Sequence, residues 1–314
     1  MSARTVIALG GNAISPAGSA GTAAEQTANI HATMVGVAAL VAEGLDELVL
    51  TPGNGPQVGN VLIKNDLARH VVPPVPLDWC VAQTQATIGF TIADTLVFEL
   101  ARHGIDRPVV PVVSRVRVDP DDPAFAAPAK PIGPYVTDVD ELARRRDAGE
   151  VWAEIDARGW RRVVSSPQPR ECLDRPAVEL LLHDGAIPVA NGGGGIPVVA
   201  SPDAPLRGVE AVIDKDLAGA LLATELHAEV YAILTDVRGV AVGFGTPDER
   251  WLTDVGVGEL RALADAGEFR AGSMGPKVEA ACQFVEATGH RAVIAALDEA
   301  RAAVNGTVGT QVHP

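Results

Sequence analysis

Three of the four lysines in this chain stand in segments rich in glycine, proline or aspartate, where loops are expected. These three are Lys130, Lys215 and Lys277, and the fourth is Lys64. The other 21 of the 25 basic residues are arginines, so lysine does not serve here as general surface charge. A compact ammonium can follow a charge that migrates during phosphoryl transfer, which a planar guanidinium cannot do. The three loop lysines therefore predict a phosphate site, although so few residues could also be placed there by chance.

The neighbours of each lysine fit that prediction to different degrees. Lys215 lies between Asp214 and Asp216, where a strand gives way to a helix. Two carboxylates keep an amine protonated and hold it in one direction, as stabilisation of a transition state requires. The alternative is that Asp216 merely caps the helix. Lys277 begins a helix, a position where acids are usual, and Lys130 lies in a proline-rich stretch from which it could reach a bound substrate.

Four glycine-rich turns accompany these lysines. In an open parallel sheet, the turns that follow strands gather at the carboxyl edge, where ligands bind. Glycine there lets backbone N–H groups approach an anion. One such turn is ordinary turn chemistry, but four together indicate a ligand with several phosphates. The turns, each expected after a strand, are Gly10-Gly11-Asn12, Gly53-Asn54-Gly55, Gly192–Gly195 and Gly272-Ser273-Met274-Gly275.

Apolar runs alternate with helical spacing along most of the chain, which predicts a mainly parallel sheet covered on both faces. The helix over 79–102 has no charge from 79 to 93, so we expect it to lie in a subunit contact. Prolines and charges gather over 119–165, which indicates either a small subdomain or lid, or a solvated excursion. The predicted strands are 6–9, 48–51, 109–118, 187–190, 197–199, 209–213, 230–234 and 293–296, and further helices begin near 22, near 57, after 216 and after 276.

Composition and missing motifs exclude several classes. The net charge of −15 argues against binding to nucleic acid or an anionic membrane. Cys80, Cys172 and Cys282 are too far apart for a disulfide framework or a thiolate zinc site, so they are expected to be buried. No targeting or membrane segment is recognised, which predicts a cytoplasmic protein. The sequence has neither a Walker phosphate loop nor a dinucleotide fingerprint, and no metallohydrolase or serine-hydrolase motif. With these classes excluded, the remaining chemistry is catalysis by positioning and positive charge without a covalent step. Phosphoryl transfer needs this kind of catalysis.

Taken together, these segments resemble the carbamate kinases of the amino-acid-kinase fold, nearly from end to end and in the same order. The resemblance implies one α/β/α domain over 1–314, with a mainly parallel open sheet in three layers and a protruding subdomain at 119–165. Its part up to about 185 would serve the phosphoryl acceptor, and 186–314 the nucleotide. The matching segments are Ala8–Ala13, Gly53–Gly59, Lys130–Pro134, Gly192–Pro197, Val209–Ala223 and Gly272–Ala280.

The resemblance also implies an activity and its residues. The reaction would be a Mg²⁺-dependent, reversible phosphoryl transfer between ATP and carbamate in a homodimer, with an ATP-forming role in arginine catabolism. Mg²⁺ would be bound mainly through the nucleotide phosphates, with no protein ligand predicted. Lys130, Lys215 and Lys277 would neutralise developing charge, and Asp216 would orient them. The substrate residues would be Gly10, Gly11, Asn12, Gly53, Asn54 and Gly55, and the nucleotide residues Asp236, Val237, Ser273, Met274 and Gly275.

Two departures from the family pattern stand near the expected acceptor site. Pro52 precedes Gly53 where the family usually has histidine, and 164–167 lacks a proline that the family often shows. Pro52 removes a side-chain donor and a backbone N–H. A kinase for another small carboxylate or carbamate-like acid is therefore the alternative within the enzymes. A non-catalytic nucleotide-binding relative is the alternative outside them.

Overall fold

The computed structural model describes residues 3–16, 19–269 and 274–314. Its centre is an eight-stranded sheet in the order β15-β17-β16-β12-β1-β2-β9-β3. The strands are parallel except for the antiparallel pair of β16 and β17. The bounds are β1 Thr5–Leu9, β2 Leu48–Pro52, β3 Val109–Pro111, β9 Ile187–Val189, β12 Val230–Thr235, β15 Asp254–Gly256, β16 Arg291–Ala296 and β17 Thr310–His313.

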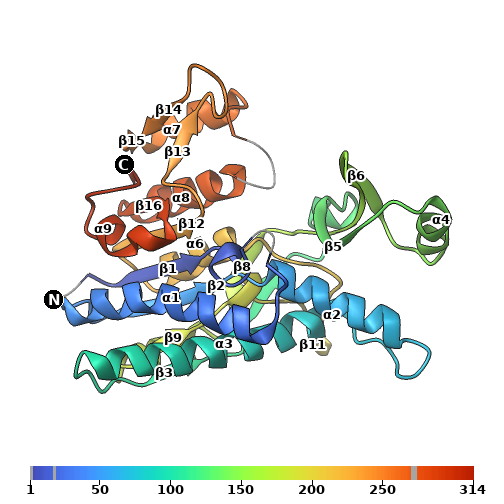
Figure 1. Cartoon of the computed structure of the whole chain (residues 1–314), viewed down its shortest axis with the longest axis horizontal. Helices are drawn as coiled ribbons and strands as arrows, with labels where there is room; N and C mark the ends of the chain where they lie inside the picture. Colours follow the sequence, from blue (N-terminus) through green and yellow to red (C-terminus); the bar gives the residue numbers. More distant parts are fainter. Residues whose placement is uncertain (1–2, 17–18, 270–273) are drawn as a thin grey trace.

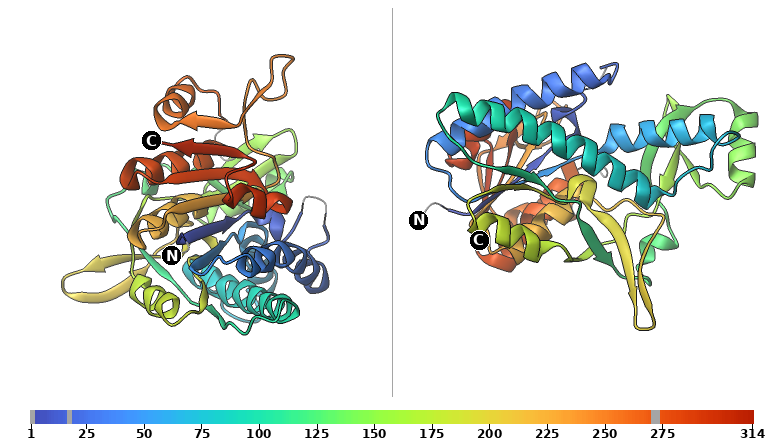
Figure 2. Two further views of the ribbon diagram at one scale, coloured as in Figure 1. Left: turned by 90° about the vertical axis from the view of Figure 1, so that its left-hand side faces the viewer. Right: turned by 90° about the horizontal axis from the view of Figure 1, so that it is seen from below.

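Helices cover both faces of this sheet (Figures 1 and 2). Strand β1 is fully buried and its side chains alternate between the two faces. Val6 and Ala8 belong to a core with α6 and α8, while Ile7 and Leu9 belong to a core with α1 and α3. The fold is therefore a three-layer α/β/α sandwich with a mainly parallel open sheet. The helices are α1 Ala23–Ala42, α2 Gly55–Ala68, α3 Leu77–Arg102, α4 Val139–Asp147, α5 Arg175–His183, α6 Lys215–Glu225, α7 Val257–Asp265, α8 Met274–Thr288 and α9 Ala300–Val304.

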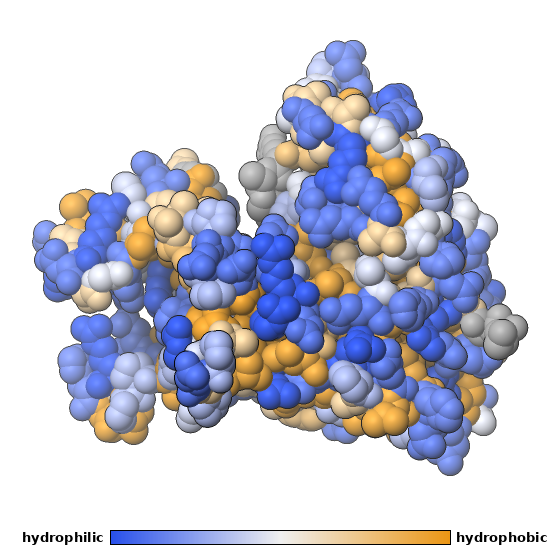
Figure 3. Space-filling view, turned by 180° about the vertical axis from the view of Figure 1, so that it is seen from behind, coloured by the Kyte–Doolittle hydropathy of each residue, from blue (hydrophilic) through white to orange (hydrophobic). Residues whose placement is uncertain are grey.

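A separate three-stranded sheet stands off the main body together with α4, within the range 119–165 (Figure 1). In the space-filling view from behind, this part projects on the left (Figure 3). We call β5–β7 with α4 the subdomain. Its strands are β5 Lys130–Val136, β6 Trp152–Asp156 and β7 Gly159–Val164.

Two further small sheets complete the structure. One has the strand order β11-β10-β4-β8 and the other is the hairpin β13-β14. Their bounds are β4 Arg115–Val118, β8 Pro169–Cys172, β10 Ile196–Ser201, β11 Ala204–Gly208, β13 Val240–Val242 and β14 Arg250–Leu252, and the short 3₁₀ turns are η1 Gly11–Ala13, η2 Pro123–Phe125, η3 Gly192–Gly194 and η4 Leu297–Glu299.

The structure corrects three of the predicted elements. The single strand expected over 109–118 is two strands in different sheets, β3 and β4, because the chain leaves the main sheet at 112–114. The strand expected over 209–213 is an irregular segment with one isolated bridge, between Ser165 and Ala211. Of the fourth predicted glycine turn, Gly272 and Ser273 lie outside the described residues, and Met274 and Gly275 already belong to α8; the described element before them is helix α7 rather than a strand. The apolar runs in the sequence do not show where the chain leaves the main sheet.

Cys80, Cys172 and Cys282 are buried, as predicted. Within the described ranges, no helix combines the length and the apolar character needed to cross a bilayer.

Candidate active site

Two cavities meet at the carboxyl edge of the main sheet. The subdomain-side cavity, of about 730 Å³, lies between the subdomain, α2 and the start of α6. The C-terminal cavity, of about 690 Å³, lies between β1, β12, the β13–β14 hairpin and α8. Gly11, Pro56 and Lys277 line both cavities. A ligand in one cavity can therefore face a ligand in the other across these residues.

The carboxylate of Asp216 binds two of the predicted lysines at this junction. Oδ1 accepts a hydrogen bond from Lys215 Nζ at 2.5 Å, and Oδ2 accepts one from Lys277 Nζ at 3.1 Å. We call these three residues the Asp216 cluster. Burial alone would raise the pKa of Asp216, but the two amines hold it at about 2. Burial lowers the pKa of Lys215, and the charge of Lys277 acts in the same direction while Asp216 opposes it.

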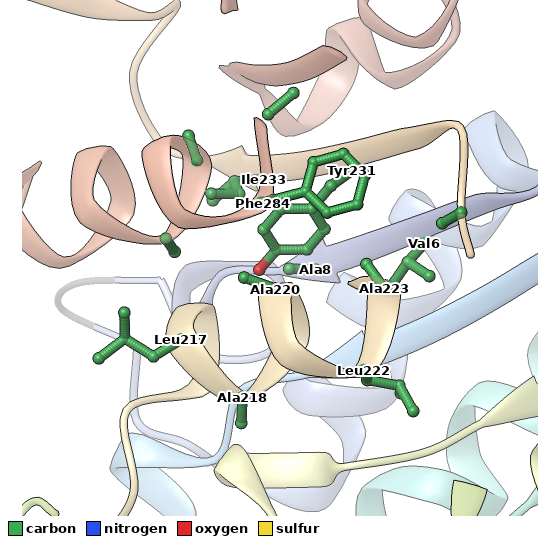
Figure 4. Packing of buried hydrophobic residues seen from close by; sticks show 14 of the residues in the cluster. Val6, Ala8, Leu217, Ala218, Ala220, Leu222, Ala223, Tyr231, Ile233 and Phe284 are labelled. Carbon is green, nitrogen blue, oxygen red and sulfur yellow. The ribbon is translucent and has the colours of Figure 1, made fainter. Parts of the chain in front are cut away.

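The start of α6 is fixed by contacts that explain why the cluster forms there. Asp214 is the N-cap of α6, and its Oδ1 accepts from the backbone N–H of Asp216 at 2.9 Å. Tyr231 on β12 donates its hydroxyl to the carbonyl of Asp216 at 2.7 Å. Figure 4 shows this ring beneath Phe284, with its oxygen turned toward α6. A Cβ on Gly219 would lie 2.5 Å from that oxygen, so glycine is needed for the approach.

Lys130 reaches the same segment from the subdomain. Its Nζ lies 3.1 Å from Asp214 Oδ2 and donates to the carbonyl of Ile213 at 3.3 Å. Asp214 therefore caps α6 with one oxygen and holds Lys130 with the other. Lys130 and all members of the Asp216 cluster line the subdomain-side cavity. The structure thus brings the three predicted lysines together, although they are far apart in the sequence.

The first two glycine turns lie against this lysine group. The backbone N–H of Gly53 donates to Leu9 at 2.9 Å, and that of Gly10 donates to Leu234 at 2.8 Å. The first bond places the turn after β2 beside the end of β1, and the second joins the turn after β1 to β12. A Cβ on Gly53 would stand 2.9 Å from the Lys215 side chain and 3.2 Å from the Gly11 nitrogen. Only a residue without a side chain fits between the lysine and the neighbouring turn.

Pro52 leaves this arrangement intact. It is the last residue of β2, is buried, and pairs with Leu9 in the parallel register. The next N–H along the chain, that of Gly53, supplies the hydrogen bond to β1. The departure of this chain from the family pattern at position 52 is therefore confined to the side chain, since the backbone of the turn is held in place.

The remaining predicted residues divide between the two cavities. Gly10 lines the C-terminal cavity alone, whereas Gly53, Asn54 and Gly55 line the subdomain-side cavity. Asn12 lies in η1, and its side chain is outside the described part of the structure.

The predicted nucleotide residues are placed at the C-terminal cavity in three of five cases. Asp236, Val237 and Met274 line it. Gly275, in the first turn of α8, is not among the described residues that line either cavity. Ser273 lies outside the described residues.

Several residues of the site were missed by the sequence reasoning. The sequence indicates Asp214 only as a neighbour of Lys215, yet in the structure this residue holds Lys130. Arg161 of β7 lines the subdomain-side cavity and donates to the carbonyl of Gly133 at 3.0 Å. Phe244 and Trp251, whose rings meet edge to face at 6.2 Å, line the C-terminal cavity. A basic residue in a strand and aromatic residues in a hairpin carry no local signal of such a role.

The geometry is suited to binding and neutralising polyanions. Four cationic side chains and two carboxylates line the subdomain-side cavity, in a protein whose formal net charge is −15. In the described ranges, no group of three or more histidine, cysteine or acidic side chains is placed to hold a metal ion. Asp214 and Asp216 are already engaged by lysines. The arrangement thus offers fixed positive charge around a reacting group, the main requirement of phosphoryl transfer.

Comparisons with known proteins agree with this reading. Residues 3–296 match the model of the amino acid kinase family. The chain is 47% identical over 313 residues to a carbamate kinase of Thermococcus kodakarensis, covering 98% of both chains. It is 45% identical to a carbamate kinase of Pyrococcus furiosus over the whole length of both. The solved structure of the carbamate kinase of Giardia lamblia bound to AMP-PNP superposes with a TM-score of 0.91, at 36% identity, covering 99% of this chain and 98% of that one.

These matches cover nearly the whole chain, including the segments that line both cavities and the subdomain. The chain belongs to the amino acid kinase family and, within it, to the carbamate kinases.

Proposed function

We propose that the protein transfers a phosphoryl group reversibly between ATP and carbamate, giving ADP and carbamoyl phosphate. One observation supports this above all: three lysines from separate segments meet where the two cavities join. In the forward direction a carbamate oxygen attacks the γ-phosphorus while the bond from phosphorus to the β–γ bridging oxygen breaks. The attacking group is already an anion, so no general base is needed.

The two cavities suggest how the substrates are divided. The nucleotide would occupy the C-terminal cavity, with its base near Phe244 and Met274 and its phosphates toward Gly10 and Gly11. The acceptor would lie in the subdomain-side cavity. Its contacts there would be with Gly53, Asn54 and Gly55.

The lysines would act on the phosphoryl group between them. Lys130, Lys215 and Lys277 would neutralise the negative charge that spreads over the equatorial oxygens in flight. Asp216 would hold two of these amines in place and would not contact the substrate itself. Catalysis would then rest on positioning and charge, with no covalent enzyme intermediate.

Mg²⁺ fits this site as a partner of the nucleotide. Because both aspartates at the junction bind lysines, the ion would be held mainly through the phosphates and water, which is usual for Mg²⁺ in kinases. When bound, it would offset part of the negative charge of the phosphates. The lysines then provide for the part of the charge that moves with the phosphoryl group.

Helix α3 supports a homodimer. Its exposed Trp79, Phe90 and Val97 are separated by nearly whole numbers of turns, which places them along one side of the helix, and Phe98 is exposed beside them. Apolar side chains grouped in this way mark an interaction surface. We also infer a cytoplasmic location and an ATP-forming role in arginine breakdown, from the likeness to the carbamate kinases and from three buried, unpaired cysteines.

The direct test mixes the protein with MgADP and carbamoyl phosphate and measures ATP. We expect rapid ATP formation that depends on both substrates. ATP binding without turnover on any acceptor would instead favour a non-catalytic nucleotide-binding relative. Because Pro52 stands where the family usually has histidine, a panel of small carboxylates with MgATP should run beside the first assay. Turnover of one of these in place of carbamate would identify a related kinase.

A further inference from the structure

Helix α3 carries two buried polar residues on the side that faces the site. Thr84 and Gln85 lie among apolar neighbours of the helix, yet their polar atoms are bonded to other segments. Neither residue lines either cavity. A buried polar group that is fully hydrogen-bonded fixes the orientation of its partners. Asn54, a partner of Thr84, lines the subdomain-side cavity, and so does Gly193, the residue after Gly192, to which Gln85 is bonded.

Thr84 determines how the side chain of Asn54 is turned. The hydroxyl of Thr84 donates its proton to the carbonyl of Val81 at 2.7 Å, so it can only accept from the amide. Asn54 Nδ2 lies 2.8 Å from this hydroxyl oxygen and therefore donates to it. The amide nitrogen of Asn54 is thus directed to α3. Its carbonyl oxygen must face the other way.

Gln85 holds the adjoining wall of the same cavity, through Gly192 next to Gly193. Its Oε1 accepts from the backbone N–H of Ser114 at 2.8 Å. Its Nε2 donates to the carbonyls of Ser114 at 3.1 Å and Gly192 at 3.0 Å. The side chain has one acceptor and two donors in use, so its orientation is determined as well. Ser114 in turn accepts from the N–H of Asn191 at 3.0 Å, which lies at φ 51° directly before Gly192.

The two walls touch each other through glycines. A Cβ on Gly192 would stand 3.1 Å from Gln85, and a Cβ on Gly193 would overlap the amide of Asn54 at 2.1 Å. Asn54 is therefore confined between the hydroxyl of Thr84 and the backbone of Gly193. Gly193 and Asn54 both line the subdomain-side cavity. A change at Thr84 or Gln85 would release one wall without touching the lysines.

We propose that Thr84 and Gln85 are positioning residues for the phosphoryl acceptor: they fix the Asn54 amide and the Gly192–Gly193 peptides against which carbamate or carbamoyl phosphate binds. This rests on the proposed function, because it places the acceptor in the subdomain-side cavity. The nucleotide lies in the other cavity and makes no contact with this wall. The two residues therefore affect the acceptor selectively.

The test compares Thr84→Val with Thr84→Ser in the ATP-forming assay. Valine keeps the shape but cannot accept from Asn54, whereas serine retains the hydroxyl. Thr84→Val should raise the KM for carbamoyl phosphate about three- to tenfold, the range expected for one lost hydrogen bond. The KM for ADP should stay within about twofold. Thr84→Ser should leave both KM values close to those of the wild type.

Thr33→Val is the matched control, since Thr33 on α1 also bonds its hydroxyl within its helix but lies away from both cavities. It should leave both KM values unchanged. Gln85→Met is the second variant, in case Thr84→Val fails to fold, and should show the same selective loss. Equal rises in both KM values, or an unchanged KM for carbamoyl phosphate, would overturn the inference. As long as the wild-type protein is active, the proposed function would still stand. An inactive wild type would overturn both.

Discussion

Two aspartates in one short segment hold lysines in different surroundings. The side chain of Asp216 is 3% exposed, and those of its partners Lys215 and Lys277 are 15% and 16% exposed. The side chain of Asp214, two residues before Asp216, is 20% exposed. That of its partner Lys130, in the subdomain, is 25% exposed. We call the latter two the Asp214–Lys130 pair. The first group is enclosed by the main body, and the second joins the body to a projecting part.

The attachment of the subdomain explains this contrast. Gly133 of β5 passes close to α2, where a Cβ on Gly59 would come within 3.2 Å of the Gly133 Cα. Farther out, Arg145 of α4 donates to Asp66 of α2 at 2.6 Å. The Asp216 cluster instead rests on α6 and α8, which share a core with the central sheet. We expect the cluster to supply fixed charge for the chemical step, and Lys130 to supply charge that arrives with the subdomain.

The largest expected effect is on the chemical step. Lys215→Met removes a fixed amine while keeping most of the side-chain volume, and it should lower kcat about a thousandfold or more, as loss of a transition-state cation does in other phosphoryl transfers. Lys64→Met, on the exposed side of α2, is the control and should retain full activity. Initial rates of ATP formation measure both. A loss of less than tenfold for Lys215→Met would show that this amine is not central.

The two aspartates should differ most in their effect on stability. Asp216→Asn leaves two largely buried amines without their carboxylate and should lower the free energy of unfolding by about 3 kcal/mol or more. Asp214→Asn keeps the helix cap and loses only a partly exposed ion pair, so the loss should be about 1 kcal/mol or less. Urea denaturation gives both values. Similar losses for the two variants would remove the distinction between the enclosed cluster and the pair.

Lys130 should affect catalysis with little effect on the fold. Lys130→Met removes the only lysine of the subdomain, and we expect kcat/KM for carbamoyl phosphate to fall about a hundredfold. The change in unfolding free energy should stay below about 1 kcal/mol, because the pair is partly exposed. Steady-state rates and urea denaturation test the two halves of this expectation. A strong destabilisation would show that Lys130 is part of the rigid body after all.

The low pKa of Asp216 predicts a specific loss of stability in acid. In the folded protein its pKa is about 2, below its ordinary value of 3.8. The group therefore stabilises the fold above about pH 4, and this contribution of about 2 kcal/mol is lost as the pH falls toward 2. Unfolding measured between pH 5 and pH 2 should show a steeper loss for the wild type than for Asp216→Asn. Parallel curves would contradict the assigned pKa.

Local patterns were enough to predict most of the alternating elements and the meeting of the lysines. Lys215 and Lys277 are at helix starts on the carboxyl edge of the sheet, and the topology of a parallel sheet brings such positions together. The partner of Lys130 was not predictable from the sequence, because it depends on the position of the subdomain relative to α6. The sequence also did not show that Val112–Ser114 leave the main sheet, since a straight strand and two short ones have the same apolar pattern.

Thr84 and Gln85 illustrate a second limit. Within the long uncharged stretch of α3, the sequence gives no sign of which segments Thr84 and Gln85 bond. Their partners Asn54 and Gly192 are defined only once the turns after β2 and β9 are placed beside the helix. Helix periodicity places them on the buried side, while only the tertiary contacts show which segments they hold.

The lysines, in the mechanism we propose, stabilise the phosphoryl group during its transfer more than they stabilise bound nucleotide. The most direct measurement is the affinity of wild type and Lys215→Met for MgADP with and without fluoroaluminate, a mimic of the transferring group, in the presence of carbamate. We expect Lys215→Met to weaken the fluoroaluminate complex by about as much as it lowers kcat, while MgADP alone binds within about twofold of wild type. Equal weakening of both complexes, or of neither, would contradict it.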